Sequence, residues 1–166
     1  MWLRTIILLV AGFGALPLTT EAQEISASFS AYAPFGVDDL DGSLPPSAEL
    51  RFSVPLSHRF AVEPFVTLGR DGGQRSAGLE GFYGAQIRHR IAALTRKDVY
   101  AFATYGAAAY YSRYGSSPFI IGHFGFGMHQ QLTRHLAFRP EVQFVTFHIV
   151  PIGARYVAGL TVKLAD

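Results

Sequence analysis

Residues 56–68 read LSHRFAVEPFVTL and residues 132–144 read LTRHLAFRPEVQF. Four positions of the two copies are identical, and most of the others keep their chemical character. In each copy a short polar link is followed by large or apolar residues at every second position. A period of two is typical of a β-strand with two different faces. The repeat therefore predicts the same turn and the same strand in two parts of the chain.

The same alternation continues along most of the chain. It is clearest in residues 47–56, where Ala48, Leu50 and Phe52 share one face and Glu49 and Arg51 share the other. Sustained helical spacing is not found. We therefore expect an all-β fold with eight strands, at residues 24–33, 47–56, 59–69, 79–91, 99–111, 119–131, 135–148 and 154–164.

The first 22 residues differ from the rest in having one early arginine, Arg4, and an apolar run over residues 6–18. This run is short for a membrane-spanning helix, so the pattern predicts a signal peptide (1–22) that is cleaved after Ala22. An N-terminal membrane anchor is the alternative. With 166 residues in all, of which 49% are hydrophobic, the remaining residues 23–166 are expected to form one domain. The chain has no cysteine, so its stability must come from packing and backbone pairing.

The connections between the expected strands alternate in kind. Residues 34–46, 70–78 and 112–118 are rich in Gly, Pro, Ser and Asp, as surface loops are, whereas the links at 57–58, 92–98 and 132–134 are mostly shorter. Long strands of even number, long loops at one end and a signal peptide are typical of a transmembrane β-barrel with apolar residues outside and polar residues inside. We therefore expect an eight-stranded antiparallel up-and-down barrel, closed so that no edge meets lipid.

The mature chain resembles the small eight-stranded outer-membrane barrels of the OmpA and OmpX kind. The residues that carry this resemblance are the phrases LSHRFAVEPFV and LTRHLAFRPEV and the terminal strand YVAGLTVKL. The last strand of that family usually ends on an aromatic residue, whereas Leu164 followed by Ala165 and Asp166 stands here. The resemblance implies location in a bacterial outer membrane, contact with its lipids, and the barrel-assembly machinery as a partner during biogenesis.

Charged residues on the polar faces are the candidate lumen residues. They are expected to pair with one another and fill the barrel, because a barrel of eight strands is just wide enough for side chains to fill and because an unpaired buried charge is costly. A narrow solute path is the alternative. The expected lumen network consists of Glu49, Arg51, Glu63, Glu80, Arg88, Arg90, Arg139, Glu141, Arg155 and Lys163. Pro64 and Pro140 occupy the same place in the two copies of the repeat, which predicts a matched β-bulge in each.

Aromatic residues near the expected strand ends permit two interpretations. They either form a girdle at the membrane interface or occur there because aromatic residues favour strands. The residues are Tyr32, Phe35, Tyr83, Tyr110, Tyr111, Tyr114, Phe119, Phe147 and Tyr156.

Other chemistry has weak support in the sequence, so no metal, cofactor or catalytic residue is expected. His123 and His129 lie six residues apart on one strand, about 20 Å at ~3.3 Å per residue, too far to share an ion. His58 and His135 fall in the two equivalent turns, and Asp38, Asp39 and Asp41 lack the spacing of a calcium loop. The basic residues are scattered, which argues against nucleic-acid binding.

The expected function is that of a small structural or surface-interaction barrel without catalytic activity, with an unidentified ligand or partner at its long loops. Two alternatives come from other classes. One is a soluble periplasmic or secreted barrel of the lipocalin kind, which would bind an apolar ligand inside. The other is an enzyme acting on lipid A, for which His148 near a strand end and Ser116 and Ser117 in a loop are the candidate residues.

Overall fold

The computed structural model describes residues 23–35, 46–70, 79–93, 98–112, 120–147 and 150–164. All eight expected strands are present, with ends that differ from expectation by a few residues. They are β1 (Glu24–Pro34), β2 (Ser47–Pro55), β3 (Phe60–Arg70), β4 (Leu79–Ala93), β5 (Val99–Ser112), β6 (Ile120–Gln131), β7 (Leu136–Phe147) and β8 (Val150–Lys163). Among these residues no helix is long and apolar enough to cross a membrane.

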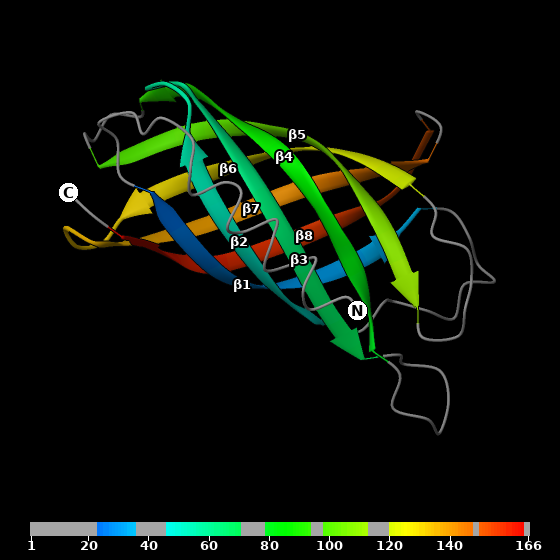
Figure 1. Cartoon of the computed structure of the whole chain (residues 1–166). Coiled ribbons are helices and arrows are strands. Elements are labelled where there is room, and N and C mark those ends of the chain that lie inside the picture. Colours follow the sequence, from blue (N-terminus) through cyan, green and yellow to red (C-terminus); the bar gives the residue numbers. More distant parts are fainter. Residues whose placement is uncertain are drawn as a thin grey trace.

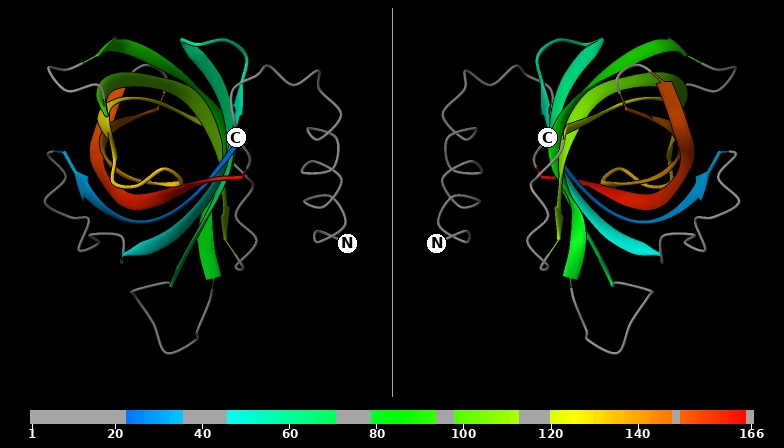
Figure 2. Two further views of the ribbon diagram at one scale, coloured as in Figure 1. Left: turned by 90° about the vertical axis from the view of Figure 1, so that its left-hand side faces the viewer. Right: turned by 90° about the vertical axis from the view of Figure 1, so that its right-hand side faces the viewer.

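The strands form one closed antiparallel barrel in which each strand pairs with its neighbours in sequence. Closure comes from β1 and β8, which pair along the whole of β1, from Glu24 opposite Lys163 to Pro34 opposite Gly153. Figure 1 shows the tilted strands from the side, and Figure 2 looks along the barrel from its two ends. The expected up-and-down eight-stranded barrel is thus confirmed.

Alternation along each strand divides the side chains between the lumen and the outside. On β1, Ser26, Ser28 and Ser30 are buried in the lumen, whereas 74% of Phe29 is exposed on the outer wall. On β6, Ile120 is 73% exposed next to the buried Ile121. The barrel is therefore apolar on its outer surface, which is the reverse of a water-soluble protein.

The repeated phrase forms the same tight hairpin twice. In the first copy, the N–H of Leu56 donates to the carbonyl of Phe60 at 2.8 Å, and the hydroxyl of Ser57 accepts the N–H of Phe60 at 3.2 Å. The second copy repeats both bonds, at 2.8 and 3.1 Å, with Thr133 in the place of Ser57. A serine or threonine is needed there because its hydroxyl satisfies backbone donors that the turn leaves unpaired. The two hairpins lie at the end of the barrel where β1 begins and β8 ends (left in Figure 1).

The prolines of the repeat do not form bulges, so that prediction is wrong. The ladder between β2 and β3 is interrupted beside Pro64, and the ladder between β6 and β7 beside Pro140, but each resumes in the same register. A proline lacks the N–H that the ladder needs, so it removes pairing without inserting a residue. The register shifts instead at residues 90–92 of β4 and at 145–146 between β7 and β8.

Several expectations concern residues outside the described part of the chain. These are the signal peptide (1–22), Asp38, Asp39 and Asp41, the aromatic residues Tyr114 and Phe119, and the enzyme candidates Ser116, Ser117 and His148.

Candidate functional site

The candidate site is the lumen, and Glu63 on β3 lies at its centre. This carboxylate is fully buried and accepts two hydrogen bonds from Arg139 on β7, at 2.7 and 2.8 Å. Gln86 on β4 donates to it at 2.7 Å, and the Nε of Arg88 lies 3.3 Å away. Glu63 therefore bonds the neighbouring strand β4 along the wall and β7 across the lumen.

A second carboxylate, Glu141 on β7, extends the network. It accepts hydrogen bonds from Arg51 at 2.6 Å, from Arg139 at 3.2 Å, from the hydroxyl of Thr104 at 2.6 Å and from Gln143 at 2.8 Å. These donors come from β2, β5 and β7 itself. Both oxygens of the carboxylate are thus occupied, as a buried charge requires.

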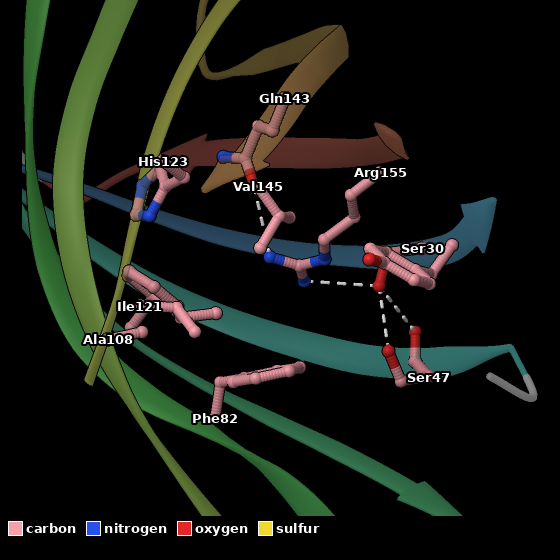
Figure 3. A pocket seen from close by; sticks show the side chains of 11 residues that line it. Ser30, Ser47, Phe82, Ala108, Ile121, His123, Gln143, Val145 and Arg155 are labelled. Carbon is pink, nitrogen blue, oxygen red and sulfur yellow. Dashed lines mark hydrogen bonds between the residues drawn. The ribbon is translucent and has the colours of Figure 1, made fainter. Parts of the chain in front are cut away.

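Glu49 on β2 forms the third centre. It accepts hydrogen bonds from Arg51 and from Arg155. Arg155 also donates to Gln143 and to the hydroxyl of Ser30, both at 3.1 Å (Figure 3). Because β8 carries Arg155 and β1 carries Ser30, these bonds reach the seam that closes the barrel.

The first inward residue of β1, Glu24, completes the charge balance but was not in the predicted site. Its carboxylate accepts a hydrogen bond from Arg88 at 3.0 Å. Its position could have revealed it, because it lies in the same alternation as the inward-facing Ser26 and Ser28. Among the described residues the lumen ion pairs join four arginines to four glutamates: Arg51, Arg88, Arg139 and Arg155 with Glu24, Glu49, Glu63 and Glu141.

The predicted site residues fall into three groups. Seven meet in the network described above: Glu49, Arg51, Glu63, Arg88, Arg139, Glu141 and Arg155. Arg90 and Lys163 lie instead at the hairpin end of the lumen, where they line a cavity. The side chain of Glu80 lies outside the described part of the structure.

Neutral polar residues in the network were not predicted as site residues. Gln86 bonds His123 at 3.0 Å and Gln143 at 3.1 Å. Because Gln86 also bonds Glu63 and Gln143 also bonds Glu141, the two glutamines link these two carboxylates. Gln86, His123 and Gln143 all lie at inward-facing positions, on β4, β6 and β7 respectively. Alternation alone could not say which inward residues would touch, because that depends on the strand register.

Glycines leave space for the network, and one buried aromatic ring packs against it. A Cβ on Gly125 would lie 2.7 Å from the carbonyl oxygen of Val142 and 2.8 Å from the hydroxyl of Thr104. The fully buried ring of Phe102 lies under the guanidinium of Arg139, 4.5 Å from its Cζ, which is a cation–π contact. The alternating glycines of β6 therefore allow the opposite side chains to approach.

The long-loop half of the lumen is apolar. Phe65, Ala108, Ile121 and Val145 form a buried cluster there. Between this cluster and Arg155 remains a cavity of about 30 Å³ (Figure 3), room for about one water molecule. This end of the lumen is therefore filled by side chains as well.

One of the aromatic residues points inward and does not belong to an interfacial girdle. The hydroxyl of Tyr32 donates to the carbonyl of Ile152 at 3.1 Å, and its ring packs against the apolar cluster. Phe35, Phe147 and Tyr156 have 44%, 41% and 54% of their surface exposed. For Tyr110 and Tyr111 the side chains are outside the described part.

The described residues bring together neither a metal centre nor a nucleophile with its base. No group of three described His, Asp or Glu residues could hold a metal ion. His123 bonds Gln86, and His129 stacks on Tyr100 at 4.7 Å between ring centroids. His58 is exposed in its turn. The charged groups at the centre of the lumen bond one another and so join its strands.

No protein-family model and no curated protein matches this sequence. Solved structures do match it. Neisserial surface protein A (NspA) is 13% identical with a TM-score of 0.60, and the match covers 86% of this chain and 96% of that one. For the N-terminal β-barrel domain of Pseudomonas aeruginosa OprF the values are 7%, 0.61, 84% and 96%. For the Yersinia pestis outer membrane protein Ail in a phospholipid bilayer nanodisc they are 14%, 0.52, 87% and 100%. This chain thus has the fold of the small eight-stranded outer-membrane β-barrels.

Proposed function

We propose that the chain is a small outer-membrane barrel with a closed lumen, which serves as a rigid, non-catalytic support for its surface loops. The observation that carries this proposal is the network around Glu63 and Glu141. It crosses the barrel from wall to wall with buried ion pairs. Eight-stranded barrels are narrow enough for side chains to fill in this way.

Location in the membrane is supported by the outer wall. Large apolar side chains are exposed along all its faces, for example Phe29, Leu50, Ile87, Tyr105 and Phe126. A water-soluble protein rarely exposes an apolar surface of this extent. The lipocalin-like alternative requires the reverse arrangement, with an apolar cavity inside, and the charged centre of this lumen disfavours it.

Partners are proposed on the same basis. Outer-membrane lipids would contact the apolar wall, and the barrel-assembly machinery would act on the chain during insertion. A ligand or partner protein would meet the long loops expected at 34–46, 70–78 and 112–118, which follow β1, β3 and β5. A fold shared with unrelated proteins does not identify that ligand, since functions reside in sites and not in folds.

Two experiments test the proposal on the purified full chain. Electrophoresis without boiling is expected to show a folded band that shifts on boiling, from the outer-membrane fraction only. In planar lipid bilayers the folded protein is expected to give no stepwise conductance. A stable channel would refute the closed lumen, and recovery of the protein in the soluble fraction without detergent would refute the membrane location.

The non-catalytic role has its own test. Expression of the chain is expected to leave the mass spectrum of lipid A unchanged. A new lipid A species that disappears in a His148→Ala variant would instead establish the enzyme alternative.

A further inference from the structure

A second, larger cavity opens at the hairpin end of the lumen. Its volume is about 280 Å³, against about 30 Å³ for the cavity in the long-loop half. We name it the basic vestibule. Its positively charged lining residues are Arg59, Arg88, Arg90 and Lys163, and its negatively charged lining residue is Glu24.

The positive charge of the basic vestibule is not neutralised within the described part of the chain. Arg88 pairs with Glu24 at 3.0 Å and with Glu63 at 3.3 Å, so its charge is balanced. Arg59, Arg90 and Lys163 form no ion pair with a described residue. In the centre of the lumen every arginine has a carboxylate, so this excess is a local property of the vestibule.

Aromatic residues hold one of these cations in place. The guanidinium of Arg90 lies 4.4 Å from the centroid of the Tyr100 ring, and the ring of His129 stacks on Tyr100 at 4.7 Å and 13°. The three residues come from β4, β5 and β6. A cation–π contact fixes a guanidinium without using its N–H donors, and among the described residues the side chain of Arg90 has no hydrogen-bond acceptor. Those donors are therefore available to a ligand.

We propose that the basic vestibule binds a phosphate-type oxyanion, either a free phosphate group or the headgroup of an anionic phospholipid. Guanidinium and ammonium groups are the side chains that bind phosphate oxygens through charge-assisted hydrogen bonds. The volume of about 280 Å³ lies just below the range of about 300–1,000 Å³ for drug-sized ligands, which suits one phosphate group with a small organic substituent. This inference adds a binding site at the hairpin end and does not depend on what the long loops recognise.

The test uses the full folded chain in the neutral detergent octyl glucoside. Sodium phosphate is titrated at an ionic strength held constant with sodium chloride, and the arginine Nε–Hε signals are followed by NMR. A saturable shift of the Arg90 signal is expected. Arg90→Gln and Lys163→Gln should each weaken binding by about tenfold, the effect of losing one charge-assisted contact. The matched control is Arg134→Gln, an exposed arginine in the hairpin between β6 and β7, which should bind as the unchanged chain does.

A second arm identifies the source of the phosphate. Dihexanoyl phosphatidylglycerol, below its micelle concentration, is compared with dihexanoyl glycerol, which has the same chains but no phosphate. Tighter binding of the phospholipid than of inorganic phosphate assigns a lipid headgroup, and equal or weaker binding assigns a soluble phosphate. Arg59→Gln, in an exposed turn, replaces any variant that loses its folded band on unboiled gels. The proposal is overturned if neither probe gives a saturable shift, if chloride alone gives the same shift, or if Arg134→Gln weakens binding as much as Arg90→Gln does.

Discussion

Replacement of Glu63 by glutamine tests the energetic role of the lumen network. Glu63 accepts hydrogen bonds at 2.7 Å from Gln86 and at 2.7 and 2.8 Å from Arg139, and it is fully buried. Glutamine has the same shape but turns one acceptor into a donor, so at least one charge-assisted bond is lost, worth about 1.5–3 kcal/mol. It also leaves Arg139 and Arg88 short of a counter-charge. Breaking a buried ion pair from one side costs about 3–5 kcal/mol, and we expect a loss of that size for Glu63→Gln.

The assay is equilibrium urea unfolding in lipid vesicles, with the folded fraction read from the band shift on unboiled gels. Asp98→Asn is the matched control, because Asp98 is an exposed carboxylate in the turn between β4 and β5, and it should change the free energy of unfolding by less than about 0.5 kcal/mol. The double variant Glu63→Met, Arg139→Met should lose less free energy of unfolding than the single variants Glu63→Met and Arg139→Met lose together. The difference should be about 1 kcal/mol or more. The reasoning is refuted if Glu63→Gln is as stable as Asp98→Asn.

Five further substitutions test the packing, the outer wall and the repeated hairpin. Gly125→Ala should destabilise the barrel by about 1–3 kcal/mol, because its Cβ would lie 2.7 Å from a backbone carbonyl oxygen. Gly122→Ala should cost less in the same urea titration, because its Cβ would lie 2.8 Å from the hydroxyl of Thr146 and 4.0 Å from a backbone carbonyl oxygen. Equal losses would contradict this. Phe29→Lys should cost about 2–4 kcal/mol in vesicles, as charges do on a lipid-facing wall, whereas no loss would mean that this wall faces water. Ser57→Ala and Thr133→Ala should each lower the free energy of unfolding by about 0.5–1.5 kcal/mol. A loss inside this range for one variant and outside it for the other would show that the two hairpins differ.

Most of the fold could be predicted from alternation, because a period of two fixes both the strand and its faces. Glu49, Arg51 and Arg139 were placed in the lumen on this basis. The bulges at Pro64 and Pro140 were predicted wrongly, because a sequence shows that a proline interrupts pairing but not whether the partner strand compensates with an extra residue. Register is a property of two strands together, so it could not be read from one.

The same reason limits the prediction of the site. Inward-facing charges were identified one strand at a time, but the network depends on which of them lie at the same height. Glu24 was missed because it stands at the start of β1, among small residues. Lys163 was predicted to belong to the lumen network, whereas it lines the basic vestibule, away from the central carboxylates. Heights follow from tilt and closure, which single strands do not specify.

The central claim is that the barrel is apolar on its outer wall and polar in its lumen. Its most direct test is the accessibility of single nitroxide labels along β1. The chain has no cysteine, so Ala27→Cys, Ser28→Cys, Phe29→Cys, Ser30→Cys and Ala31→Cys can each be labelled without background. In lipid vesicles, labels at 27, 29 and 31 should collide with dissolved oxygen, which concentrates in the bilayer, and hardly with a water-soluble nickel chelate. Labels at 28 and 30 should collide little with either reagent. Preferential collision of the labels at 27, 29 and 31 with the nickel chelate would show that this wall faces water and would contradict the account.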